Sequence, residues 1–176
     1  HIRMEGSSAR VGYTIDVTRG DEVWNSSQVW YMPFDDMNDP VTDEISMWPW
    51  REAYYTINVC NFILSRTTGD DASLSESMKK IKGQALFLRG YSYYTLAGYY
   101  QNPTLITDYA NYSSLDGLYG KNSTYDEVLD QVEKDFAEAM TLLPSRDAGG
   151  QWAKGRATCG AAAGYYARTL MQRHKY

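Results

Sequence analysis

The sequence is poor in the residues that build catalytic and metal sites. It contains two histidines, His1 and His174, which stand at opposite ends of 176 residues. A Ser-His-Asp arrangement or a histidine-rich metal site is therefore not expected. Cys-x-x-Cys pairs and glycine-rich phosphate loops are also missing from the sequence. We therefore expect a protein that is not an enzyme and that uses no cofactor.

Long apolar runs and blocks of like charge are missing as well. Seventeen basic and 22 acidic residues give a formal net charge of −5. This balance argues against nucleic acid or an anionic membrane surface as a partner. No apolar run approaches the roughly 18 residues of a membrane span.

The two cysteines, Cys60 and Cys159, stand in helical patterns among apolar or small neighbours. Free thiols are the favoured interpretation. A disulfide between them requires their helices to lie side by side in register, and the sequence leaves this open.

Aromatic residues are abundant, with 16 Tyr and 5 Trp against 4 Phe. Most of these rings carry a polar group, which suits binding clefts as well as packed cores. Many of them fall in two helical patterns, WPWREAYYTINVCNFIL and KIKGQALFLRGYSYYTLAGYYQN. The second pattern adds a stripe of small residues, which predicts close approach to a partner helix.

The periodicity predicts a first helical hairpin over residues 46–102. Its first helix runs from Trp48 to about Arg66, with Pro49 in the first turn. A capping box formed by Ser73 and Glu76 predicts the start of the second helix, which ends before Pro103.

A second hairpin is predicted over residues 123–176. Thr124 and Glu127 form a capping box, and Pro144 ends the helix that they begin. The last helix is expected from about Arg156 to the end of the chain. With an offset of 72 residues, Gly83, Ala85, Tyr93 and Tyr94 fall on Gly155, Ala157, Tyr165 and Tyr166. This match suggests a degenerate helix-loop-helix repeat.

Residues 1–45 lack sustained periodicity and are expected to form an irregular segment that packs on the helices. The chain starts at His1 without a methionine and stops at Tyr176 within an apparent helix. We therefore expect a fragment of a longer protein.

Several aromatic residues occur in or just after the irregular segment. Indole and phenol rings stack on the C–H faces of sugars, and amides bond to sugar hydroxyls. The candidate ligand-binding residues are Trp24, Asn25, Trp30, Tyr31 and Trp48. Plugs that cover the core of the first hairpin are the slightly favoured interpretation of these rings, and Trp48 is among the most plausible plugs.

An acidic cluster in the same segment includes Asp35, Asp36 and Asp39. Paired carboxylates serve in glycoside hydrolysis and in calcium binding. The segment fails the EF-hand pattern because it has no glycine at the sixth position and a proline interrupts it. Solvated turn residues are the favoured interpretation, and these three aspartates are only a weak calcium candidate.

Four helix motifs together resemble the SusD/RagB family of outer-membrane nutrient-binding lipoproteins. They are Trp50-x-x-x-Tyr54-x-x-Ile57-x-x-x-Asn61, Ile81-x-Gly83-Gln84-Ala85-x-Phe87-Leu88-Arg89, Asp135-x-x-x-Ala139-x-x-Leu142-Leu143-Pro144 and Gly155-Arg156-Ala157-Thr158-x-x-Ala161-Ala162. A charged Arg89 among small and apolar neighbours needs a carboxylate partner, and Asp135 is the candidate.

The resemblance implies an all-α fold of two tetratricopeptide-like helix pairs with a long irregular N-terminal segment, the N-terminal helical part of a larger SusD-like fold without its C-terminal half. It implies a surface lipoprotein of the outer membrane that delivers a glycan or other nutrient to a SusC-like TonB-dependent transporter. The lipid anchor would precede this chain. The alternative is a helical-repeat scaffold that binds only proteins.

Overall fold

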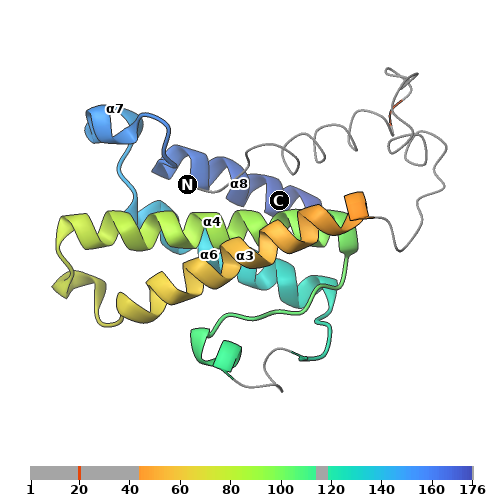
Figure 1. Ribbon diagram of the computed structural model, residues 1–176. Coiled ribbons are helices and arrows are strands. Elements are labelled where there is room, and N and C mark those ends of the chain that lie inside the picture. Colours follow the sequence, from red (N-terminus) through yellow and green to blue (C-terminus); the bar gives the residue numbers. More distant parts are fainter. Residues whose placement is uncertain (1–19, 21–43, 114–118, 176) are drawn as a thin grey trace. The chain divides into compact units, whose positions relative to one another are not determined.

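The structure is a computed structural model that describes residue 20 and residues 44–113 and 119–175 (Figure 1). The described residues form helices and loops with no strand among them, which confirms the predicted all-α class. The chain divides into two compact units, residues 1–55 and 56–176, and each is described by itself. The predicted packing of residues 1–45 on the helices falls mostly outside the described residues and stays a prediction. No helix in the described ranges is long and apolar enough to cross a membrane.

Four long helices dominate the described part of the chain, and shorter helical turns connect them. The long helices are α3 (Glu44–Arg66), α4 (Glu76–Tyr100), α6 (Tyr125–Leu142) and α8 (Cys159–Gln172). The short elements are η1 (Asp71–Ser73), η2 (Tyr109–Ser113), α7 (Arg146–Gly149) and η3 (Gly150–Ala153).

Two of the predicted helix starts are wrong. Helix α3 begins at Glu44, so Pro49 lies inside the helix and not in its first turn. Helix α4 begins after Ser75, whose hydroxyl accepts a hydrogen bond from the Met78 N–H at 3.3 Å. Ser73 cannot cap α4 because it ends η1, where its hydroxyl donates to the Asp70 carbonyl at 2.6 Å. Both serines have the residue type of a helix cap, and only the preceding turn decides between them.

Helix α4 is the central helix of the second unit and packs along α6, which in turn packs along α8. Figure 1 shows α4 and α6 running in opposite directions. A fully buried core surrounds this contact. Its large side chains include Tyr93, Leu96, Leu129, Val132 and Phe136. The small-residue stripe of α4 therefore faces helices, as its composition predicts.

The glycines of α4 differ in their surroundings. A Cβ at Gly83 would lie 2.9 Å from the Leu143 side chain, and one at Gly90 would lie 3.2 Å from Asp135 Cβ. At Gly98 an added Cβ would meet nothing within 4 Å. Gly90 therefore permits close packing of α4 on α6. Gly83 permits close packing on Leu143, which follows the C-terminal end of α6.

Helix α6 has the predicted capping box. The Glu127 N–H donates to Thr124 Oγ1 at 3.3 Å, and the Thr124 N–H donates to Glu127 Oε2 at 2.7 Å. Near the same end of the hairpin, Arg173, which follows α8, pairs with Asp130 at 2.5 Å and with Glu133 at 2.6 Å. These ion pairs join the end of α8 to α6.

Helix α8 begins at Cys159, three residues after the predicted start, and ends at Gln172 before the chain does. Its cap is Thr158, whose hydroxyl accepts from the Ala161 N–H. Gly155 has φ +73° and lies with Ala157 in the preceding loop, whereas Gly83 and Ala85 lie inside α4. The predicted 72-residue repeat is therefore wrong at its first two positions.

Both cysteines are free thiols, which confirms the favoured interpretation. Cys60 is buried in α3, and burial raises the pKa of its thiol to about 12. Cys159 is half-buried at the start of α8. The Cys60 thiol is thus held in its unreactive protonated form.

Candidate functional site

Most of the predicted ligand-binding residues lie outside the described residues. This applies to Trp24, Asn25, Trp30 and Tyr31, and also to the calcium candidates Asp35, Asp36 and Asp39. Trp48 lies near the start of α3 and is half-buried. The assignment of all eight residues stays a prediction. Within the described ranges, no group of three or more His, Cys, Asp or Glu residues could hold a metal ion.

The centre of the helical unit is an ion pair between Arg89 of α4 and Asp135 of α6. Arg89 Nε donates to Asp135 Oδ2 at 2.8 Å, and Nη2 donates to Oδ1 at 2.7 Å. Gln131 Nε2 also donates to Asp135 Oδ1 at 2.7 Å. Both members of the pair are buried. The carboxylate partner predicted for Arg89 is confirmed.

The guanidinium of Arg89 remains charged in this buried position. Burial alone would lower the pKa of Arg89, but the hydrogen bond and the charge of Asp135 outweigh that effect and raise it. A fork of two parallel N–H···O bonds is the strongest arrangement available to such a pair. The pair therefore neutralises the charge that burial would otherwise make very costly.

The same arginine also holds a loop. Its Nη1 donates to Asn61 Oδ1 at 2.9 Å and to the Thr107 carbonyl at 3.3 Å. Asn61 of α3 donates in turn to the Ile106 carbonyl at 2.7 Å. Tyr93 Oη donates to that carbonyl at 2.9 Å and accepts from the Ile106 N–H at 2.7 Å. Side chains from two helices therefore satisfy the buried backbone of Ile106 and hold the carbonyl of the exposed Thr107.

The base of this loop is closed by its own hydrogen bonds. The Ser123 N–H donates to the Pro103 carbonyl at 3.1 Å, and the Leu105 N–H donates to Ser123 Oγ at 3.3 Å. The chain between α4 and α6 is thus fixed at its base and at residues 106 and 107. Such a connection can carry binding groups on a rigid support.

An exposed patch lies where α3 approaches η2. It consists of Val59, Phe62, Arg66 and Tyr109. The Phe62 and Tyr109 rings meet edge to face with centroids 5.2 Å apart, yet the residues are 43% and 40% exposed. The Arg66 guanidinium lies 5.3 Å from the Phe62 ring centroid. Large apolar side chains that remain exposed together are typical of a contact surface.

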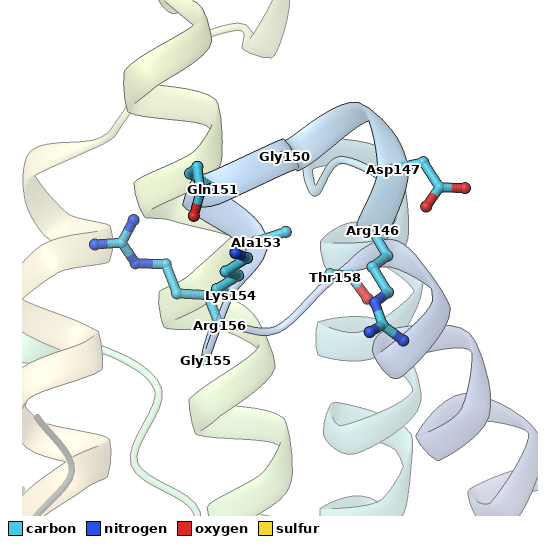
Figure 2. Close-up of a pocket in the computed structure, with 9 residues that line it drawn as sticks. All are labelled: Arg146, Asp147, Gly150, Gln151, Ala153, Lys154, Gly155, Arg156 and Thr158. Atoms are coloured by element: carbon cyan, nitrogen blue, oxygen red, sulfur yellow. The ribbon is translucent and has the colours of Figure 1, made fainter.

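An open cavity of about 800 Å³ lies in the segment that joins α6 to α8 (Figure 2). Its lining carries three cations and one carboxylate. The lining residues are Arg146, Asp147, Gly150, Gln151, Ala153, Lys154, Gly155, Arg156 and Thr158. The sequence predicts only that most of this stretch connects Pro144 to the last helix. Three cations within eleven residues of an acidic chain are the signal that could have identified it.

A family model described as "Starch-binding associating with outer membrane" (SusD-like) matches residues 4–171 of the chain. No curated protein matches the chain. The family match covers nearly the whole chain, including the residues that carry the four helix motifs.

Solved structures have the same fold. A SusD superfamily protein from Bacteroides vulgatus matches with a TM-score of 0.79 at 20% identity, covering 93% of this chain and 34% of that one. A laminarin-binding SusD-like protein matches with a TM-score of 0.76 at 19% identity, covering 97% of this chain and 36% of that one. The surface glycan-binding protein A of Bacteroides thetaiotaomicron, solved with laminarihexaose, matches with 0.71 at 17% identity, covering 92% and 33%. The chain thus spans about a third of the length of these proteins.

Proposed function

This chain belongs to the SusD-like family, and we propose that it is part of a cell-surface protein that binds glycans for an outer-membrane uptake system. The observation that carries the proposal is the family match over residues 4–171. The similarity to a laminarin-binding protein and to a protein solved with laminarihexaose supports a saccharide as the ligand.

The helical unit would serve as the support for the binding loops. The Arg89 and Asp135 pair and the anchored backbone of Ile106 give this support a rigid centre. The ligand itself would be held by the aromatic and amide side chains that precede the first hairpin. The residues proposed for this role are Trp24, Asn25, Trp30, Tyr31 and Trp48.

We propose that the protein binds and transfers its ligand without cleaving it. Its partner would be a SusC-like TonB-dependent transporter, and a lipid anchor would hold it at the cell surface. Co-purification of such a transporter with the tagged protein from outer membranes tests the partnership. Recovery of the tagged protein without a transporter would contradict it.

The ligand assignment is tested by calorimetric titration with a panel of neutral oligosaccharides, laminarin oligomers included. The Trp24→Ala and Trp30→Ala double variant should bind the preferred oligosaccharide about 10-fold or more weakly, because truncating an aromatic residue that anchors a ligand costs about 2 kcal/mol or more.

A matched control removes two exposed rings elsewhere, Phe62 and Tyr119, by substitution with alanine. Both side chains are exposed, Tyr119 to 83%. The control should keep the affinity of the parent. Equal binding by the Trp24 and Trp30 variant would show that these rings do not contact the sugar.

A protein-binding scaffold is the second candidate function, and the exposed patch on α3 and η2 favours it. Phe62→Ser and Val59→Ser would then abolish capture of a protein partner and leave saccharide binding unchanged. If the parent binds no saccharide and the patch variant loses a partner, the scaffold function replaces the first proposal.

A further inference from the structure

The cavity in the segment that joins α6 to α8 differs from the rest of the chain in its charge. Its lining contains three cations, Arg146, Lys154 and Arg156, and one carboxylate, Asp147, in a chain with a net charge of −5. Figure 2 shows the Asp147 side chain directed away from Lys154 and Arg156. The cavity therefore presents a local excess of positive charge.

Within the described part of the chain, neither Arg146 nor Lys154 has a carboxylate within ion-pair distance. Some other cations of the unit do have such partners. Lys82 pairs with Asp71 at 2.8 Å and with Glu138 at 2.7 Å, and Arg173 pairs with Asp130 and Glu133. Arg146 and Lys154 are thus available to bind an anion, whereas Arg156 Nη1 donates to the Trp152 carbonyl at 3.5 Å.

The segment that carries these groups is held in place. The Cys159 N–H donates to the Pro144 carbonyl at 3.0 Å, which closes the loop at its base. Gln84 of α4 bonds to both backbone groups of Ala157. Its Nε2 donates to the Ala157 carbonyl at 2.6 Å, and its Oε1 accepts from the Ala157 N–H at 3.2 Å. A ligand would therefore meet a segment that is already ordered.

Trp152 anchors the middle of the segment. Its ring packs against the core formed by Leu86, Ala139, Leu143 and Ala162. Lys80 Nζ lies 5.3 Å from the ring centroid, and the Arg156 guanidinium lies 5.1 Å from it. The stacking of Arg156 fixes one of the three cations at the cavity.

We propose that this cavity is a subsite for acidic saccharides, in which Arg146 and Lys154 bind carboxylate or sulfate groups. The inference rests on the proposed function, since it assigns a class of glycan to a second site on the same protein. Arginine matches the two oxygens of a carboxylate or sulfate group with paired donors. The amide of Gln151, which also lines the cavity, is suited to the sugar hydroxyls.

The test is calorimetric titration of the parent with an oligogalacturonate and with a neutral oligosaccharide that it binds. The Arg146→Gln and Lys154→Gln double variant should bind the oligogalacturonate about 5-fold more weakly, as expected for two exposed charge contacts. Its affinity for the neutral oligosaccharide should not change. Raising the salt concentration should weaken oligogalacturonate binding by the parent, because exposed charges are screened.

The matched control is the Lys121→Gln and Lys134→Gln double variant, which removes the same positive charge from exposed positions away from the cavity. It should bind the oligogalacturonate as the parent does. Both double variants should keep the parent's thermal midpoint, which shows that they are folded.

Several results would overturn the inference. The first is equal loss of oligogalacturonate affinity in the control, and the second is no loss in the cavity variant. The third is binding of an acidic peptide but no acidic saccharide. A parent that binds the neutral oligosaccharide but not the oligogalacturonate contradicts this inference alone. A parent that binds no saccharide at all contradicts the proposed function as well.

Discussion

Two regions of the helical unit use cations in opposite ways. At its centre, Arg89 is buried, and its donors are directed to Asp135, Asn61 and the Thr107 carbonyl. Between α6 and α8, Arg146 and Lys154 are exposed at an open cavity and have no ion pair among the described residues. The first arrangement stabilises the fold, and the second leaves charge available to a ligand. Removing charge should therefore affect stability in one region and binding in the other.

The largest expected effect is on the central pair. Asp135→Ala leaves the Arg89 charge buried without its partner and should lower the free energy of unfolding by about 3–5 kcal/mol. Urea denaturation followed by circular dichroism measures this change. Asp130→Ala on the same helix is the control, because Asp130 is exposed and Arg173 keeps its pair with Glu133, so the loss should be at most about 1 kcal/mol. Equal losses in the two variants would remove the distinction between buried and exposed pairs.

Tyr93→Phe should have the next largest effect. It removes the hydroxyl that accepts from the Ile106 N–H and leaves this buried donor unpaired, whereas the Ile106 carbonyl keeps its bond from Asn61. We expect a loss of about 1–3 kcal/mol in urea denaturation. Tyr119→Phe, at an exposed ring, should cost nothing measurable. An unchanged stability of the Tyr93 variant would show that water replaces the lost bonds.

Gly83→Ala tests the close packing of α4. Its Cβ would meet Leu143 at 2.9 Å, and the strain of about 1–3 kcal/mol should outweigh the helical preference for alanine of about 1 kcal/mol. Gly98→Ala, with open space at Cβ, should instead stabilise the protein by up to about 1 kcal/mol. The thermal midpoints should therefore shift in opposite directions. A shift in the same direction would contradict the assignment of Gly83 to a tight contact.

The smallest expected effect belongs to the cavity. Arg146→Gln should change the free energy of unfolding by less than about 0.5 kcal/mol, because the side chain is exposed and makes no ion pair among the described residues. Chemical denaturation checks this against Lys121→Gln, another exposed cation. A larger loss would mean that Arg146 supports the fold and is not free for a ligand.

Much of the helical frame could be predicted from local signals. The capping box of Thr124 and Glu127 sets the start of α6, and a buried arginine requires a carboxylate such as Asp135. Local signals failed where two solutions compete within a few residues. Ser73 and Ser75 are both suitable caps, and the turn at Asp70 decides between them. The repeat suggested by Gly155 and Ala157 failed because those residues lie in a loop.

The candidate sites were less accessible to sequence reasoning. The aromatic candidates such as Trp24 and Trp30 depend on whether their rings are covered or exposed, and composition does not decide this. The cavity at Arg146 and Lys154 depends on which cations lack a carboxylate nearby. That property is set by residues on other helices, so it cannot be read from the segment itself.

The sequence by itself determined the helical class, the periodic faces of α4 and α6 and the family, because these depend on residue type and on spacing along the chain. Only the tertiary structure decided that Asn61 and Tyr93 hold the backbone of Ile106, and that Gln84 holds Ala157. It also decided which cations are neutralised and which remain free. The physical reason is that hydrogen bonding and charge compensation depend on distances between residues far apart in the sequence, and folding alone sets those distances.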